Sequence, residues 1–143
     1  MKPRFEIVPA TGERTIRLRM SGDFDVGAMS QFLVDYKRVS QPLAGSPHLI
    51  LADLRGLNPT SPEVAAIFGE AIEYSRAVGV VCCAHLSDDT ITQLQAARLA
   101  RKSSPQSDVT VDVASREEAE RLLDEVRARL NLTSDSSSDN QGA

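Results

Sequence analysis

The segment 49–64 constrains the fold of this chain more than any other. An apolar run of strand length stops at Asp53, and a short loop follows it. Ser61-Pro62-Glu63 then has the signature of a helix start, because Ser is a good N-cap and Pro gives up an amide that would be unpaired anyway. The segment therefore predicts a buried strand, a short loop and an amphipathic helix, with the hydroxyls of Thr60 and Ser61 at the positive end of that helix.

Hydrophobic periodicity predicts the other elements. We expect strands over 5–8, 15–20, 48–54, 80–84 and 109–113. We expect helices that begin after Asp25, Ser61, Ser87 and Ser115. The order β-β-α-β-α-β-α-β-α predicts a single α/β domain with a mixed sheet, in which an opening hairpin is followed by parallel central strands.

Composition supports one globular domain and excludes some functions. The chain has 143 residues, of which 41% are hydrophobic and 25% charged, as in ordinary globular proteins. A net charge of -4 argues against binding nucleic acid through a basic face. The sequence has no apolar run of roughly 20 residues, as a membrane span needs. Because its first residues include no apolar segment of the kind that a signal peptide has, we expect no signal peptide. We therefore expect a cytoplasmic protein.

The last residues differ in composition from the rest. From Thr133 onward the chain consists almost entirely of small and polar residues. Such a segment cannot bury enough apolar surface to offset the entropy of ordering it. The sequence predicts an α/β domain over 1–130 and a disordered, acidic and serine-rich tail over 131–143.

Three segments carry a resemblance to a known family. They are Gly22-Asp23-Phe24-Asp25 before the first helix, the strand at 49–57 and the closing segment 115–130. Together with the element order, they resemble the STAS-like superfamily, which comprises sulfate transporter and anti-sigma factor antagonist domains and their SpoIIAA-like relatives.

The resemblance implies a function for the loop after the third strand. In the family, this loop carries an Asp-Ser-Ser/Thr-Gly motif in which a partner kinase phosphorylates one hydroxyl. The matching window here, 59–63, keeps two hydroxyls, Thr60 and Ser61, but lacks the Asp before them and the Gly after them. The implied function is a non-enzymatic regulatory module that binds a protein partner through the second helix and adjacent loops, with phosphorylation of Ser61 or Thr60 as its regulation. The alternative is a small-molecule or lipid-binding SpoIIAA-like domain.

The partner-binding candidates are polar residues on or near these loops. They are Asp23, Asp25, Asp53, Asn58, Thr60, Ser61, Glu63 and His85. Each also has a purely structural interpretation. Ser61 and Asp25 can simply cap helices, and Glu63 already supplies the negative charge that a helix start favours.

Other polar residues allow further interpretations. Asp23, Asp25, Asp53, Asp88 and Asp89 raise the question of a metal or acid–base cluster, but they lack a metal-binding spacing. An enzyme that uses Asp23, Asp53 and His85 ranks last, because the sequence has no nucleophile elbow or nucleotide-binding loop. We expect no catalytic residue, no metal and no cofactor, while the oligomeric state stays open.

Two further expectations concern the strands. His48 follows Pro47 at the start of a strand, and we expect an exposed residue at the sheet edge. Cys82 and Cys83 are adjacent in a strand, so their side chains should enter the core on opposite faces of the sheet.

Overall fold

The computed structural model describes residues 1–87 and 110–142, with side chains through residue 131. Its centre is a five-stranded sheet with the order β1-β2-β3-β4-β5. The strands are β1 (Arg4–Ala10), β2 (Thr15–Ser21), β3 (His48–Asp53), β4 (Val80–Leu86) and β5 (Thr110–Val113). The pair β1–β2 is antiparallel, and every other neighbouring pair is parallel.

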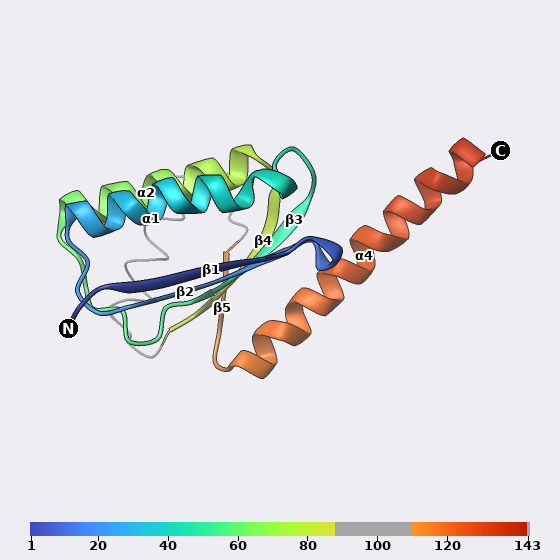
Figure 1. The fold of residues 1–143 in the computed structure, drawn as a ribbon. Coiled ribbons are helices and arrows are strands. Elements are labelled where there is room, and N and C mark those ends of the chain that lie inside the picture. Colours follow the sequence, from blue (N-terminus) through green and yellow to red (C-terminus); the bar gives the residue numbers. More distant parts are fainter. Residues whose placement is uncertain (88–109, 143) are drawn as a thin grey trace.

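Helices cover both faces of this sheet. In the described part of the chain they are α1 (Val26–Ser40), α2 (Pro62–Ala77) and α4 (Arg116–Gly142), with 3-10 turns η1 (Thr11–Glu13) and η2 (Gln41–Leu43). Helices α1 and α2 lie side by side on one face, and α4 crosses the other (Figure 1). Since α1 follows β2 and α2 follows β3, both helices begin at the edge where these two parallel strands end.

The sheet separates two hydrophobic cores. Ile16, Phe32 and Ile50 belong to the core beneath α1 and α2, whereas Leu51 and Leu123 belong to the core beneath α4. Every residue of β3 is buried, because helices pack on both of its faces.

The two cysteines lie in the core as expected. Cys82 is buried in the α4 core, and Cys83 packs against the core beneath α1 and α2. The prediction that their side chains enter opposite faces is confirmed. Burial raises the pKa of the Cys82 thiol, and the charge of Arg129 offsets only part of that effect.

The predicted single α/β domain with a mixed sheet and an opening hairpin is confirmed. The helix expected after Ser87 lies outside the described residues, so the full β-β-α-β-α-β-α-β-α order stays a prediction. No described helix is long and apolar enough to span a membrane.

Helix α4 differs from expectation at its end. It continues to Gly142, whereas composition predicts a disordered tail over 131–143. No Pro or Gly interrupts the sequence between Arg116 and Gln141, so no helix breaker occurs before Gly142. The domain boundary at residue 130 stays a prediction.

The capping box at the start of α4 is largely as expected. Ser115 Oγ accepts a hydrogen bond from the Glu118 amide at 3.1 Å. Glu118 reaches back to the Ala114 amide at 3.0 Å, one residue before the amide that a standard capping box would satisfy.

Candidate functional site

Backbone hydrogen bonds join the loop after β2 to the loop after β3. The Gly22 amide donates to the Gly56 carbonyl at 2.8 Å, and the Asn58 amide donates to the Gly22 carbonyl at 3.1 Å. Gly22 has φ +89°, and a Cβ there would collide with the carbonyl oxygen of Lys2. Only glycine fits this position, because both the backbone conformation and the space exclude a side chain.

Asp23 and Asn58 bring side chains from the two loops together. Asn58 Nδ2 donates to Asp23 Oδ1 at 2.6 Å, and the Met1 amine donates to Asp23 Oδ2 at 2.8 Å. The hydrogen bond from the Met1 amine, followed by that from Asn58, holds the pKa of the exposed Asp23 carboxyl below its usual value. Two sequence-predicted candidates that are 35 positions apart are therefore in direct contact.

Asp25 starts helix α1. Its Oδ1 accepts a hydrogen bond from the Ala28 amide at 2.8 Å, and its carbonyl accepts from Met29 at 3.0 Å. The predicted N-cap is confirmed, and it leaves Asp25 exposed at the beginning of the helix.

Ser61 starts helix α2 in the same way. Its Oγ accepts a hydrogen bond from the Val64 amide at 3.3 Å, and Pro62 occupies the first helical position. Glu63 is exposed in the first turn, and Thr60 is half-buried. The helix start predicted from the sequence is confirmed.

Six of the predicted residues therefore lie along one edge of the molecule, where β2 and β3 end and α1 and α2 begin. We call this set the helix-start surface. It consists of Asp23, Asp25, Asn58, Thr60, Ser61 and Glu63.

Asp53 does not join the helix-start surface. It alternates with Ala52 along β3, so its side chain lies on the α4 face of the sheet, where it is 4% exposed. Arg55 Nε and Nη2 donate to its two carboxyl oxygens at 3.0 and 2.9 Å. Burial raises the pKa of Asp53, but the hydrogen bonds and charge of Arg55, helped by the charge of Arg19, outweigh burial and hold the pKa below its usual value.

His85 does not join it either. It lies within β4, in register with Ala52 of β3 and Asp112 of β5, and is 4% exposed. A buried imidazole offers little surface to a partner, so His85 lies in the core of the domain and not on a docking surface.

The expectation of an exposed His48 is wrong. His48 is fully buried, because β3 is an inner strand and His48 pairs with Val80 of β4. Its Nδ1 lies 2.8 Å from the carbonyl oxygen of Ser46, which fixes the ring at the start of the strand.

Within the described residues, no three His, Cys, Asp or Glu side chains are grouped closely enough to hold a metal ion. Of the carboxylates considered for such a cluster, Asp88 and Asp89 lie outside the described residues.

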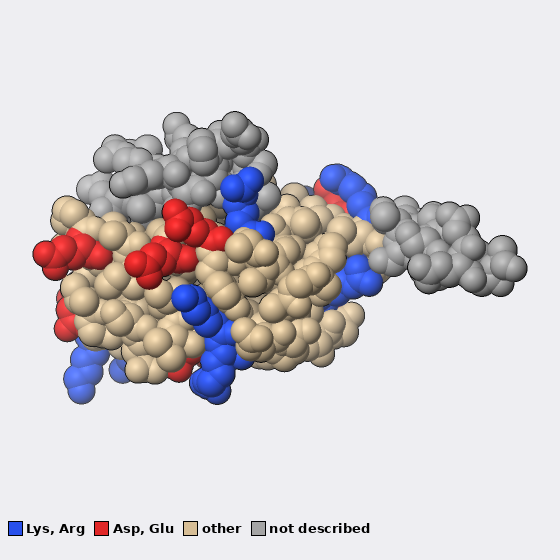
Figure 2. Space-filling view, turned by 90° about the horizontal axis from the view of Figure 1, so that it is seen from above, with Lys and Arg blue, Asp and Glu red and all other residues tan. Residues whose placement is uncertain are grey.

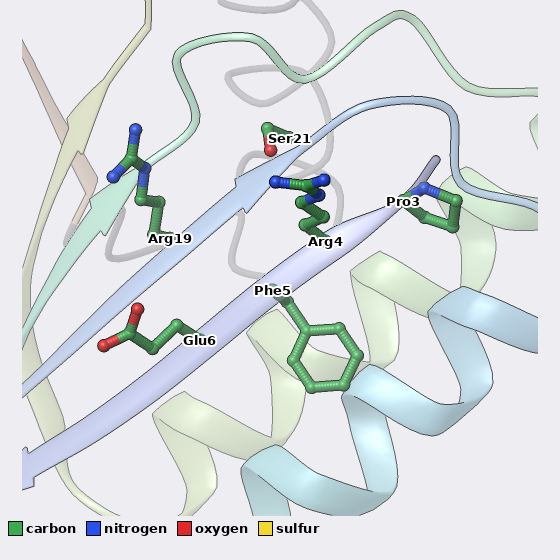
Figure 3. A pocket seen from close by; sticks show the side chains of 6 residues that line it. All are labelled: Pro3, Arg4, Phe5, Glu6, Arg19 and Ser21. Atoms are coloured by element: carbon green, nitrogen blue, oxygen red, sulfur yellow. The ribbon is translucent and has the colours of Figure 1, made fainter. Parts of the chain in front are cut away.

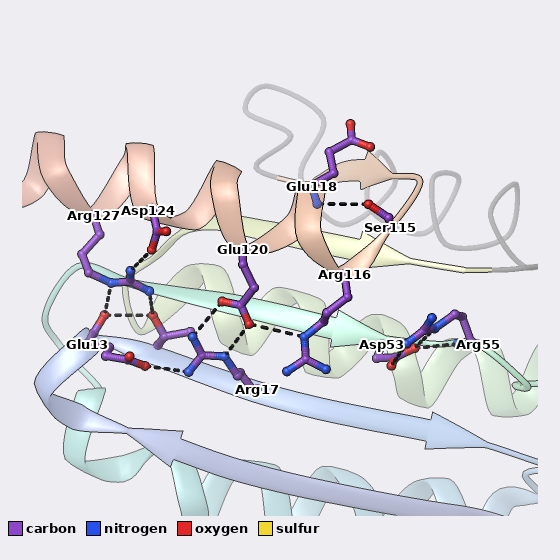
Figure 4. Close-up of polar contacts among 11 residues, drawn as sticks. Glu13, Arg17, Asp53, Arg55, Ser115, Arg116, Glu118, Glu120, Asp124 and Arg127 are labelled. Carbon is purple, nitrogen blue, oxygen red and sulfur yellow. Dashed lines mark hydrogen bonds and ion pairs between the residues drawn. The ribbon is translucent and has the colours of Figure 1, made fainter.

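An ion-pair network that the sequence did not reveal fixes α4 on the sheet (Figure 4). Arg17 of β2 donates to both carboxyl oxygens of Glu120 at 3.1 and 2.8 Å, and Glu120 also accepts from Arg116 at 3.3 Å. Arg127 donates to the Glu13 carbonyl oxygen at 2.7 Å. The hydrogen bond with Arg17 is the main reason that the pKa of Glu120 lies below its usual value. The sequence carried one signal for this network. Arg17 and Arg19 alternate with apolar residues in β2, which places them on the face opposite Ile16 and Leu18.

Comparison with known proteins gives no match, either to a model of a protein family or to a curated protein. The similarity to STAS-like domains therefore remains a resemblance carried by the sequence segments named above.

Proposed function

We propose that this protein is a non-enzymatic regulatory module that binds a protein partner through the helix-start surface and the exposed face of α2. The observation that carries the proposal is the rigid joining of the loops after β2 and β3. Backbone bonds between Gly22, Gly56 and Asn58 hold these loops in one arrangement before any partner arrives. A surface ordered in advance loses less conformational entropy on binding.

The charge of α2 indicates the kind of partner. Glu63, Glu70 and Glu73 are all exposed on this helix. Figure 2 looks onto the side that α1 and α2 cover, where acidic side chains gather with uncharged surface and some basic side chains beside them. Because complementary charge speeds encounter and selects partners, a partner with a basic docking surface fits best.

A charge-reversal experiment tests the surface. Glu70→Lys/Glu73→Lys should abolish capture of a defined partner from the native cell, whereas Glu117→Lys/Glu125→Lys, on exposed positions of α4, should retain it. Circular dichroism should show that both variants remain folded. Retention of the same partner by the α2 variant, or equal loss in both variants, would contradict docking through α2.

Phosphorylation at Ser61 or Thr60 is the regulation that we propose for this surface. A helix start stabilises a nearby negative charge, whereas Glu63 would repel a phosphate on Ser61. Intact mass spectrometry of protein from its native cell should detect a phosphorylated species that disappears in Ser61→Ala or Thr60→Val. The absence of any modified species would remove phosphorylation from the proposal and leave the docking surface standing.

A further inference from the structure

A groove follows strands β1 and β2 on the side of the sheet away from α1 and α2. Its volume is about 620 Å³, within the usual range of small-ligand sites. It is lined by Pro3, Arg4, Phe5, Glu6, Arg19 and Ser21. A second groove shares Glu6 and Arg19 and continues toward Arg116 at the start of α4.

Strand register brings two arginines and a hydroxyl together in this groove. Arg4 pairs with Ser21 across the antiparallel strands, and Glu6 pairs with Arg19. Arg4 and Arg19 are therefore diagonal neighbours on one face, with Cα atoms roughly 7–8 Å apart. Figure 3 shows Arg4, Arg19 and Ser21 along the same side of the strands, while Phe5 points toward the helices.

These two guanidinium groups differ from the neighbouring ones. Arg17 and Arg116 both bind Glu120, and Arg55 occupies both oxygens of Asp53. Across the side chains described at 1–87 and 110–131, those of Arg4 and Arg19 have neither a hydrogen bond nor an ion pair. The donors of both guanidinium groups are therefore available to a ligand.

We propose that this groove binds the phosphate group of a phosphate monoester, between Arg4 and Arg19 and beside the Ser21 hydroxyl. Guanidinium groups match phosphate oxygens with paired N–H donors. The two positive charges of Arg4 and Arg19 also fit a doubly negative phosphate better than a singly negative carboxylate. Two carboxylates face Arg19, that of Glu6 from β1 and that of Asp53 from β3. Both repel the phosphate and direct it toward the Arg4–Ser21 end of the groove. The site lies on the face opposite α2 and does not depend on the proposed docking function.

Nuclear magnetic resonance titration with glycerol phosphate tests the site, with glycerol as the uncharged control. We expect the Nε–H signals of Arg4 and Arg19 and the Ser21 amide to shift, and the shifts to weaken at high salt. The same phosphate is found on a lipid headgroup. Pelleting with phosphatidic acid vesicles, compared with phosphatidylcholine vesicles, therefore distinguishes a lipid source from a soluble one.

Matched variants decide the outcome. Arg4→Gln/Arg19→Gln should weaken binding at least about tenfold. Glu6→Gln should strengthen it. Arg38→Gln/Arg121→Gln removes the same charge from exposed positions elsewhere and should leave binding unchanged. The proposal is overturned if neither glycerol phosphate nor phosphatidic acid vesicles bind, or if both double variants weaken binding equally.

Discussion

Replacement of Gly22 by alanine probes the junction that holds the helix-start surface. Gly22 has φ +89°, and an added Cβ would meet the Lys2 carbonyl oxygen and lie 3.2 Å from Pro3 Cα. The carbonyl belongs to backbone rather than to a flexible side chain, so the chain before β1 must move. That movement would disturb the two backbone hydrogen bonds that Gly22 itself makes, from its amide to the Gly56 carbonyl and from the Asn58 amide to its own carbonyl.

Two other glycines separate the causes of the expected loss. Gly45 has φ +88° but nothing within 4 Å of an added Cβ, so Gly45→Ala measures the backbone cost alone, about 1–2 kcal/mol. Gly22→Ala should add an overpacking cost of about 1–3 kcal/mol. Gly12 has open space and no positive φ, so Gly12→Ala should be neutral or up to about 1 kcal/mol stabilising.

Urea unfolding followed by circular dichroism measures these differences, provided that the m-value stays constant. We expect the free energy of unfolding to fall in the order Gly12→Ala, Gly45→Ala, Gly22→Ala. Equal losses in Gly22→Ala and Gly45→Ala would refute the collision with Lys2. A Gly22→Ala protein as stable as Gly12→Ala would refute the whole argument.

Three further predictions concern packing, charge and capping. Leu123→Ala, at a fully buried position on the sheet-facing side of α4, should lower the free energy of unfolding by about 2–5 kcal/mol, and Leu130→Ala, which is only half-buried, should cost less. Because Arg55 lowers the folded-state pKa of Asp53, the carboxylate stabilises the fold above about pH 4 and loses this contribution as the pH falls further. Asp53→Asn should therefore be less stable than the wild type near neutral pH. Between about pH 4 and about pH 3, its urea midpoint should fall less than that of the wild type, and equal falls in the two proteins would contradict this reasoning. Ser61→Ala should lose about 1 kcal/mol in urea unfolding, whereas Ser61→Asp, which can still cap α2, should lose little.

Signals within a few residues determined the helices and the strand pattern. The caps at Asp25, Ser61 and Ser115 each satisfy an amide three positions later, and their side chains identified them in advance. The alternation of side chains along a strand was equally readable, which is why Cys82 and Cys83 were assigned to opposite faces correctly.

Residues far apart in the chain determined the rest. His48 looked like an edge residue, but the sheet order made β3 an inner strand and buried it. Asp53 is buried rather than part of the loop surface, because α4, more than 60 positions later in the chain, covers the face of β3 on which it lies. The sequence pattern indicated that β3 is buried but did not show which strands would flank it.

The sequence alone thus determined where each of the described helices begins and which strand faces are apolar, because these properties depend on residues three or four positions apart or on simple alternation. Only the tertiary structure joined Asp23 to Asn58 and Arg17 to Glu120, which are 35 and 103 positions apart. It also placed Arg4 diagonally across from Arg19 in a groove. These contacts depend on strand order and register, and a polar side chain carries no local signal of the distant residue that it will meet.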